Sequence, residues 1–188
     1  MKREPGRVEV LAGPMFAGKT EELLRRVRRA VVAGRSVQTF THALDIRQGA
    51  GRIASHAGLE HPSHAVGSAV EILPMLRPET DMVAIDEAHF FGPELVGVVG
   101  ELASRDVVVI VAGLDVTFAG QPFEPLPALM AVAERVDKLT AICTACGAEA
   151  VFHERTALAS ASDTDVVPEH VGGSEKYRAR CRRHFGSP

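Results

Sequence analysis

Short apolar runs alternate with amphipathic stretches over the first 140 or so residues of the chain. Leucine, valine and alanine recur at helical spacing from Leu23 to Val31, and Gly34 is a suitable end for that helix. A second helix is expected over Pro93–Ser104, with proline near its start. Four short runs have the length and composition of buried strands, at residues 8–12, 36–41, 82–85 and 107–112. This alternation predicts an α/β fold, a mostly parallel sheet with helices on both faces.

The remaining segments carry weaker patterns. Residues 43–62, rich in Gly, Ala, Ser and His, show no clean periodicity and predict a long loop. The proline-rich passage at 121–127 predicts a rigid loop. The composition changes near residues 138–142, where the cysteine-bearing part begins. We therefore expect two domains, an α/β domain over 1–140 and a small C-terminal domain over 141–188.

A phosphate-binding loop follows the first predicted strand. Its glycines let successive backbone N–H groups surround a phosphate, the next helix adds its positive dipole end, Lys19 supplies a charge and Thr20 a magnesium ligand. A plain glycine-rich turn would not explain the Lys-Thr pair. The pattern G-x-x-x-x-G-K-[ST] is satisfied at every fixed position by Gly13, Pro14, Met15, Phe16, Ala17, Gly18, Lys19 and Thr20. The segment predicts nucleoside triphosphate binding.

Two acids end the strand at 82–85. Asp86 would order a Mg²⁺ ion, directly or through water, and Glu87 could accept the proton of a nucleophile. In a parallel sheet Gly13, Asp86 and Leu114 would converge beyond the carboxyl ends of the strands. Alternatively, the two acids could cap the following helix. The letters Asp86-Glu-Ala-His89 also match a helicase motif, but those motors close two ATPase-like domains around one nucleotide and this chain has room for one.

Charge and composition exclude several classes of protein. The 188 residues carry a formal net charge of −3 and a pI near 6.2, which argues against a general nucleic-acid binder. The basic stretch Arg25–Arg29 is interpreted as the solvated face of a helix. No apolar run approaches the roughly 18 residues of a membrane span, and the N-terminus lacks a signal-peptide core. We expect a cytoplasmic protein with no membrane contact.

Two ligand pairs near the C-terminus predict a metal site. Cys143 and Cys146 form one pair, and Cys181 and His184 form the other, with a long insert between them. Two such pairs complete a closed tetrahedral Zn²⁺ site. The alternatives are a buried thiol pair with a surface histidine, or free thiols with a redox role.

Taken in order, these motifs resemble type II thymidine kinases over nearly the whole chain. The phosphate loop with the following Glu-Glu-Leu-Leu-Arg-Arg is similar to that family's opening. So are Asp45-Ile-Arg47, Ser55-His56, Asp86-Glu-Ala-His-Phe-Phe91, Gly113-Leu-Asp-Val-Thr-Phe118, Val136-Asp-Lys-Leu-Thr140 before Cys143, and Val171-Gly-Gly-Ser-Glu-Lys-Tyr177 before Cys181.

The resemblance implies an ATP-dependent kinase that phosphorylates the 5′-hydroxyl of thymidine, giving ADP and dTMP for pyrimidine salvage. Glu87 would be the general base, Asp86 would order Mg²⁺ through its water shell, and Arg47 and His89 would belong to the ATP-binding group. The C-terminal domain would resemble a zinc ribbon and carry a nucleoside-binding loop, the lasso, over about 155–177, with zinc fixing its roots. The nucleoside-binding positions implied by the resemblance are Met15, Phe90, Leu114, Phe118, Phe123, His153, His170, Gly172, Gly173 and Tyr177.

The resemblance also implies a homotetramer and feedback inhibition by dTTP. Three histidines depart from the family pattern: His89 stands where glutamine is usual, His153 where a small residue often faces the base, and His170 at a usually apolar lasso position. A neutral imidazole both donates and accepts, so His89 can replace glutamine. His153 and His170 would change the polar partners of the base, so the site could also accept other pyrimidine nucleosides. The alternative hypothesis, from a different functional class, is a non-catalytic protein that senses nucleotides.

Overall fold

A six-stranded parallel sheet forms the body of the computed structural model, which describes residues 5–45, 51–54, 58–156 and 176–186. Neighbouring strands follow the order β5-β2-β6-β7-β1-β8, and each pair is parallel. The strands are β1 (Arg7–Ala12), β2 (Val37–His42), β5 (His64–Val66), β6 (Met82–Ile85), β7 (Val108–Gly113) and β8 (Arg135–Lys138). All four strands predicted from the sequence are present, and the predicted parallel sheet is confirmed.

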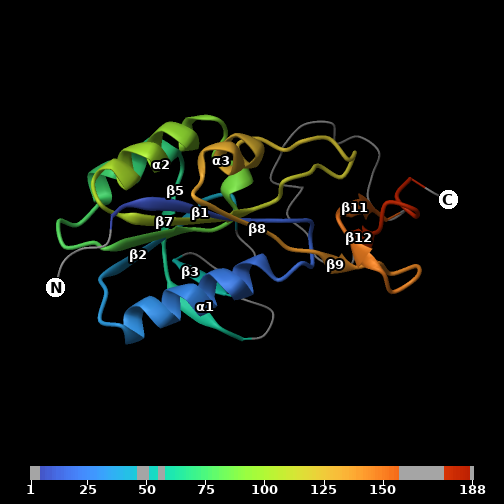
Figure 1. The fold of residues 1–188 in the computed structure, drawn as a ribbon, viewed down its shortest axis with the longest axis horizontal. Coiled ribbons are helices and arrows are strands. Elements are labelled where there is room, and N and C mark those ends of the chain that lie inside the picture. Colours follow the sequence, from blue (N-terminus) through green and yellow to red (C-terminus); the bar gives the residue numbers. More distant parts are fainter. Residues whose placement is uncertain (1–4, 46–50, 55–57, 157–175, 187–188) are drawn as a thin grey trace.

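Helices cover both faces of this sheet (Figure 1). Helix α1 (Lys19–Val32) lies on one face, and α2 (Glu94–Ser104) and α3 (Leu126–Val132) lie on the other. Three short 3₁₀ helices complete the connections: η1 (Ala69–Glu71), η2 (Leu73–Met75) and η3 (Ala88–Phe90). The predicted covering of both faces is therefore confirmed.

Alternation along the central strands divides the core between the two faces. Val10 of β1 and Val109 of β7 pack in the cluster that contains α2, whereas Leu11 and Ile110 pack in the cluster that contains α1. All four side chains are at most 1% exposed. Since burial of one such side chain contributes about 1.5–3 kcal/mol, the continuous apolar runs hold the sheet between its helices.

The prediction of a long loop over 43–62 is wrong for the part of this segment that the structure describes. Strand β3 (Arg52–Ala54) pairs antiparallel with β4 (Glu60–Pro62), and β5 follows directly in the main sheet. Each strand of this pair has only three residues, and Ile53 is its one fully buried apolar side chain. Such a short pattern gives no readable periodicity.

Two further expectations are corrected. The proline-rich loop ends earlier than predicted, because α3 begins at Leu126 with Pro127 in its first turn, where a missing N–H has no cost. The basic stretch on α1 is not wholly solvated: Arg26 is 8% exposed. Its guanidinium contacts Glu9 of β1, Glu22 of α1 and Asp137 of β8 at 2.6 to 2.9 Å.

The C-terminal part consists of two small antiparallel sheets. Strand β9 (Ala141–Ile142) pairs with β10 (Glu149–Ala150), and β11 (Phe152–Arg155) pairs with β12 (Tyr177–Arg180). Their shared core includes Ala141, Ala150 and Ala179 together with two cysteines. The division into domains at residue 140 stays a prediction. Within the described ranges no helix has the length and apolar character that crossing a bilayer requires.

Candidate functional site

The phosphate loop connects the end of β1 to the start of α1, as predicted. Gly13 and Gly18 have φ angles of 151° and 77°, and a Cβ added at Gly13 would lie 2.4 Å from the Leu139 carbonyl oxygen. Phe16 also adopts a positive φ, 67°. The Lys19 ammonium donates to the Pro14 carbonyl at 2.7 Å, within the loop. This backbone directs the N-terminus of α1 toward the loop, the arrangement that binds phosphate.

The acidic pair lies at the carboxyl end of β6, at the same edge of the sheet. Asp86 is 4% exposed, and its Oδ1 accepts a 2.9 Å hydrogen bond from the Glu87 N–H. Glu87 has a φ of 50°, in the left-handed region that a residue with a Cβ seldom adopts. Such strain costs about 1–3 kcal/mol and concentrates at functional sites. The left-handed backbone at Glu87 therefore marks the acidic pair as a candidate functional position.

His89 lies beside the Glu87 carboxylate. Its Nε2 is 3.4 Å from Glu87 Oε2, and its Nδ1 accepts a 3.2 Å hydrogen bond from the Leu114 backbone N–H. The rings of Phe90 and Phe123 contact the imidazole, with centroids 4.3 and 5.1 Å away. His89 therefore connects the end of β6 to the loop after β7.

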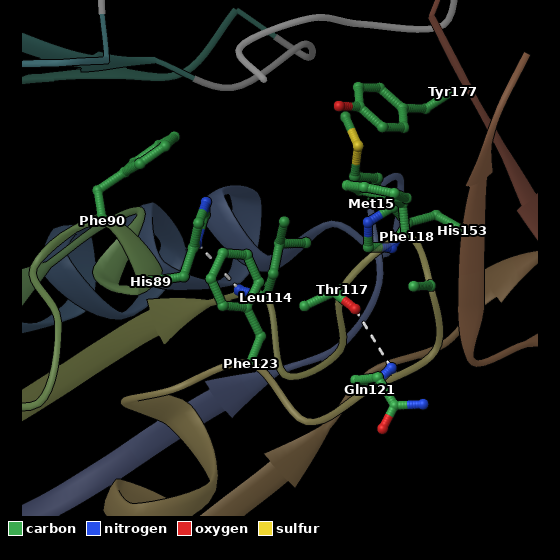
Figure 2. A pocket seen from close by; sticks show the side chains of 11 residues that line it. Met15, His89, Phe90, Leu114, Thr117, Phe118, Gln121, Phe123, His153 and Tyr177 are labelled. Carbon is green, nitrogen blue, oxygen red and sulfur yellow. Dashed lines mark hydrogen bonds between the residues drawn. The ribbon is translucent and has the colours of Figure 1, made fainter. Parts of the chain in front are cut away.

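A pocket of about 270 Å³ opens beyond the strand ends (Figure 2). Met15 of the phosphate loop and His89 both line it, so the pocket borders the loop and the acidic pair. Its walls are mainly apolar and aromatic, the usual character of a small-molecule site. The lining residues are Met15, His89, Phe90, Leu114, Thr117, Phe118, Ala119, Gln121, Phe123, His153 and Tyr177.

The structure thus brings together seven of the predicted nucleoside-binding residues in one pocket. Sequence reasoning missed Thr117, Ala119 and Gln121, which follow β7 in a loop without periodicity. The alternation of polar and apolar residues gives no sign of which side chains in such a loop face inward. The predicted Arg47, His170, Gly172 and Gly173 lie outside the described residues, as does most of the predicted lasso.

His153 is an uncharged polar group in the wall of the pocket. It is 2% exposed, and its Nδ1 has no hydrogen-bond partner among the residues that the structure describes. Burial, aided by the charge of Lys19 and by His89, lowers the pKa of His153 to about 3. The imidazole is therefore neutral near pH 7 and offers a hydrogen bond to a ligand. Across the pocket wall, its ring meets that of Tyr177 edge-on, with centroids 5.8 Å apart.

The four predicted metal ligands form one cluster. Sγ of Cys146 lies 3.8 Å from Sγ of Cys181, and Nδ1 of His184 lies 3.3 Å from Cys181 Sγ and 3.8 Å from Cys143 Sγ. A tetrahedral Zn²⁺ with bonds of about 2.3 Å to sulfur would hold two sulfurs about 3.8 Å apart. Hydrogen bonds, first from the Cys181 backbone, lower the pKa of Cys143 to about 5, so its ligating thiolate form is favoured. The cluster therefore fits zinc in both chemistry and spacing.

The metal cluster is placed to support the pocket. Cys143 follows β9 directly and Cys146 lies in the turn to β10, whereas Cys181 and His184 follow β12. Strands β11 and β12 carry His153 and Tyr177 into the pocket wall. A metal in this cluster would join the two segments that present these side chains.

Comparison with known proteins decides the family. The family model described as thymidine kinase matches residues 6–185. A thymidine kinase of Deinococcus deserti is 46% identical over 189 residues, which cover 95% of this chain and 94% of that protein. The chain belongs to the thymidine kinase family. Its resemblance to that family is thereby confirmed, and the chain is an enzyme of this family.

Two solved structures of distant proteins resemble this chain to different degrees. The flagellar accessory protein FlaH from Methanocaldococcus jannaschii has a TM-score of 0.52 at 12% identity, covering 78% of this chain and 76% of that chain. Domain III of the replication initiation protein DnaA from Thermotoga maritima has a TM-score of 0.44 at 14% identity, covering 72% and 56%. The first likeness supports the α/β architecture that carries the family's site here.

Proposed function

We propose that this chain transfers the γ-phosphoryl group of ATP to the 5′-hydroxyl of thymidine, giving ADP and dTMP for pyrimidine salvage. The main support is that the phosphate loop, the acidic pair and the apolar pocket adjoin one another. Met15 belongs to the phosphate loop and lines the pocket, and His89 lines the same pocket beside Glu87. A donor on the loop and an acceptor in the pocket would meet at the carboxylate. Catalysis by proximity needs this arrangement.

Each residue of the site has a distinct proposed task. The loop amides and Lys19 bind the β- and γ-phosphates of ATP. Thr20 and Asp86 are hard oxygen ligands that would hold Mg²⁺, which offsets phosphate charge when bound with ATP. Arg47, which the family resemblance assigns to the phosphates, remains a predicted member of this group. His89 remains a predicted member of it too, although it lies in the pocket wall.

The proposed transfer is an in-line displacement. The 5′-oxygen forms a bond to the γ-phosphorus while the bond from that phosphorus to the β–γ bridging oxygen breaks, and ADP leaves with the electron pair. Glu87 accepts the proton of the 5′-hydroxyl. An apolar pocket around the acceptor reduces the access of water to the γ-phosphate and so limits hydrolysis of ATP.

The nucleoside would fill the aromatic pocket, with His153 and Tyr177 in its wall. The resemblance adds His170, Gly172 and Gly173, in a lasso over about 155–177, as further predicted contacts. It also adds dTTP as a feedback inhibitor and a homotetramer as the assembly. These belong to the proposal together with a cytoplasmic location, a 1–140 and 141–188 domain division, and structural zinc on the four-ligand cluster.

One assay tests the proposed function. The purified protein is incubated with γ-labelled ATP, Mg²⁺ and a panel of thymidine, deoxyuridine, deoxycytidine and deoxyadenosine. We expect labelled dTMP as the main product, with a weaker product from other pyrimidines if the pocket admits them. ATP binding without any labelled nucleotide would instead support a nucleotide sensor and contradict the proposal.

A further inference from the structure

The hydrogen bond from Leu114 fixes the proton of His89. A backbone N–H can only donate, so His89 Nδ1, which receives the Leu114 N–H at 3.2 Å, must carry a lone pair. The ring proton is therefore on Nε2. That nitrogen faces Glu87 Oε2 at 3.4 Å, so a ring donor faces a carboxylate acceptor.

The packing around His89 holds this orientation. The His89 side chain is 4% exposed, and the Glu87 side chain beside it is 13% exposed. Phe90 and Phe123 contact the imidazole at its sides, and a ring flip would place the Nδ1 lone pair elsewhere and leave the partly buried Leu114 N–H without this acceptor. Rotation of the ring therefore costs a hydrogen bond, and this keeps Nε2 directed at Glu87.

We propose that His89 is a positioning residue that holds the Glu87 carboxylate for proton transfer, through its Nε2–H and in the tautomer set by the Leu114 amide. One carboxylate oxygen faces His89, which leaves the other for the acceptor hydroxyl. The inference rests on the proposed function, because it takes Glu87 as the general base. It assigns His89 to the base rather than to the phosphates of ATP.

Glutamine and leucine at position 89 separate the alternatives. Gln has an acceptor oxygen at one end of its amide and donor hydrogens at the other, so His89→Gln can accept from Leu114 and donate to Glu87. His89→Leu has a similar volume and does neither. We expect kcat within about threefold of wild type for the glutamine variant and about tenfold or more lower for the leucine variant, a part of the 10²–10⁴-fold that a general base supplies. His64→Leu, at an exposed position on β5, is the control for loss of an imidazole.

Two readouts exclude a merely structural role. The loss in His89→Leu should fall on kcat, with KM for ATP and for thymidine within about threefold of wild type. In a Glu87→Gln background the same substitution should change turnover by less than about twofold, because the group on which it acts has been removed. Nitrogen-15 NMR of ring-labelled protein should also show His89 as the neutral Nε2–H tautomer.

Several outcomes would overturn the inference. They are equal losses in the Glu87 and Glu87→Gln backgrounds, failure of glutamine to restore turnover in a folded variant, or an Nδ1–H tautomer in the spectrum. Thermal unfolding of each variant shows whether it is folded, and the tautomer measurement on wild type does not depend on any variant. A wild-type protein that makes no dTMP would overturn the proposed function and this inference with it, whereas an active wild type with any of the outcomes above overturns the inference alone.

Discussion

At the scale of single residues, the proposed base Glu87 has a left-handed backbone and a carboxylate beside His89. Glu87→Gln keeps the shape of the side chain but cannot accept the 5′-hydroxyl proton, so we expect kcat to fall roughly 100-fold or more. Binding of ATP should change little, because the phosphate loop is untouched. Steady-state assays and calorimetric titration with an ATP analogue measure the two quantities. Glu94→Gln, exposed on α2, is the control, and near-normal turnover of the Glu87 variant would contradict its role.

His153 gives a second prediction at this scale, on stability. Its pKa is lowered to about 3 in the folded protein, from about 6.5 unfolded, so the unfolded chain binds more protons between these values. The stabilising contribution of neutral His153 is complete above pH 6.5 and decreases as pH falls toward 3. At pH 5 the loss relative to pH 8 is about 2 kcal/mol.

His153→Gln has no titrating group at this position and should lose that part of the pH dependence. Urea unfolding of wild type and variant at pH 8 and pH 5 measures the difference, since titrations common to both proteins cancel. The variant should lose less stability than wild type between the two pH values. Equal losses in both proteins would show that His153 is not buried in its neutral form.

At the scale of secondary-structure elements, Arg26 fastens α1 to the sheet. The Arg26 side chain is 9% exposed, and its guanidinium pairs with Glu9 of β1, Asp137 of β8 and Glu22 of its own helix. Arg26→Ala removes the most buried cation of the group and, among the described residues, leaves Glu9 paired with Arg7 and Asp137 with Arg135. We expect a loss of about 3 kcal/mol in the free energy of unfolding, the low end of the cost of removing one partner from a buried ion pair. The same contacts lower the pKa of Glu22, through Arg25 first and also through Arg26, to about 2.

Arg25→Ala is the matched control, because Arg25 is exposed and pairs with the same Glu22. It should change stability far less, since exposed ion pairs contribute little. Urea unfolding at neutral pH measures both variants. Similar stabilities of the two would show that the contacts of Arg26 add nothing beyond an exposed pair.

The same elements show what the sequence could predict. The strands at 82–85 and 107–112 could be predicted because their residues are apolar throughout. The reason for this composition is that helices cover both faces of the sheet, so that every side chain of these strands is buried. The β3–β4 pair is not predictable from the sequence, because strands of three residues contain too few buried positions to show a pattern. The burial of Arg26 is not predictable either, because two of its carboxylate partners are distant in the sequence. Motifs with fixed spacing placed the phosphate loop, the acidic pair and the metal cluster. Thr117 and Gln121 could not be found, because loop geometry alone turns them into the pocket.

At the scale of the whole molecule, the proposed zinc would connect the two small antiparallel sheets of the C-terminal part to each other. Cys143 and Cys146 lie between β9 and β10, and Cys181 follows β12, which brings Tyr177 to the pocket. Removal of the metal should therefore loosen the wall of the pocket more than the phosphate loop, which is held between β1 and α1 and contacts the cysteine-containing core through Ala17.

Cys146→Ser and chelator-treated wild type should both bind thymidine about tenfold more weakly, a change of about 1.4 kcal/mol in binding free energy. Binding of an ATP analogue should weaken less, by no more than about threefold, because β1 and α1 hold the phosphate loop, whose contact with the cysteine-containing core is made by the small side chain of Ala17. Ala145→Ser, a neighbour that is not a ligand, is the control variant, and calorimetry with metal analysis of each protein measures binding and zinc content together. Native protein that contains no zinc would contradict the metal assignment, and equal weakening of both ligands would contradict its link to the nucleoside pocket. Selective weakening ties the stability of the small C-terminal sheets to substrate recognition, because the strands that hold the metal also form the pocket wall.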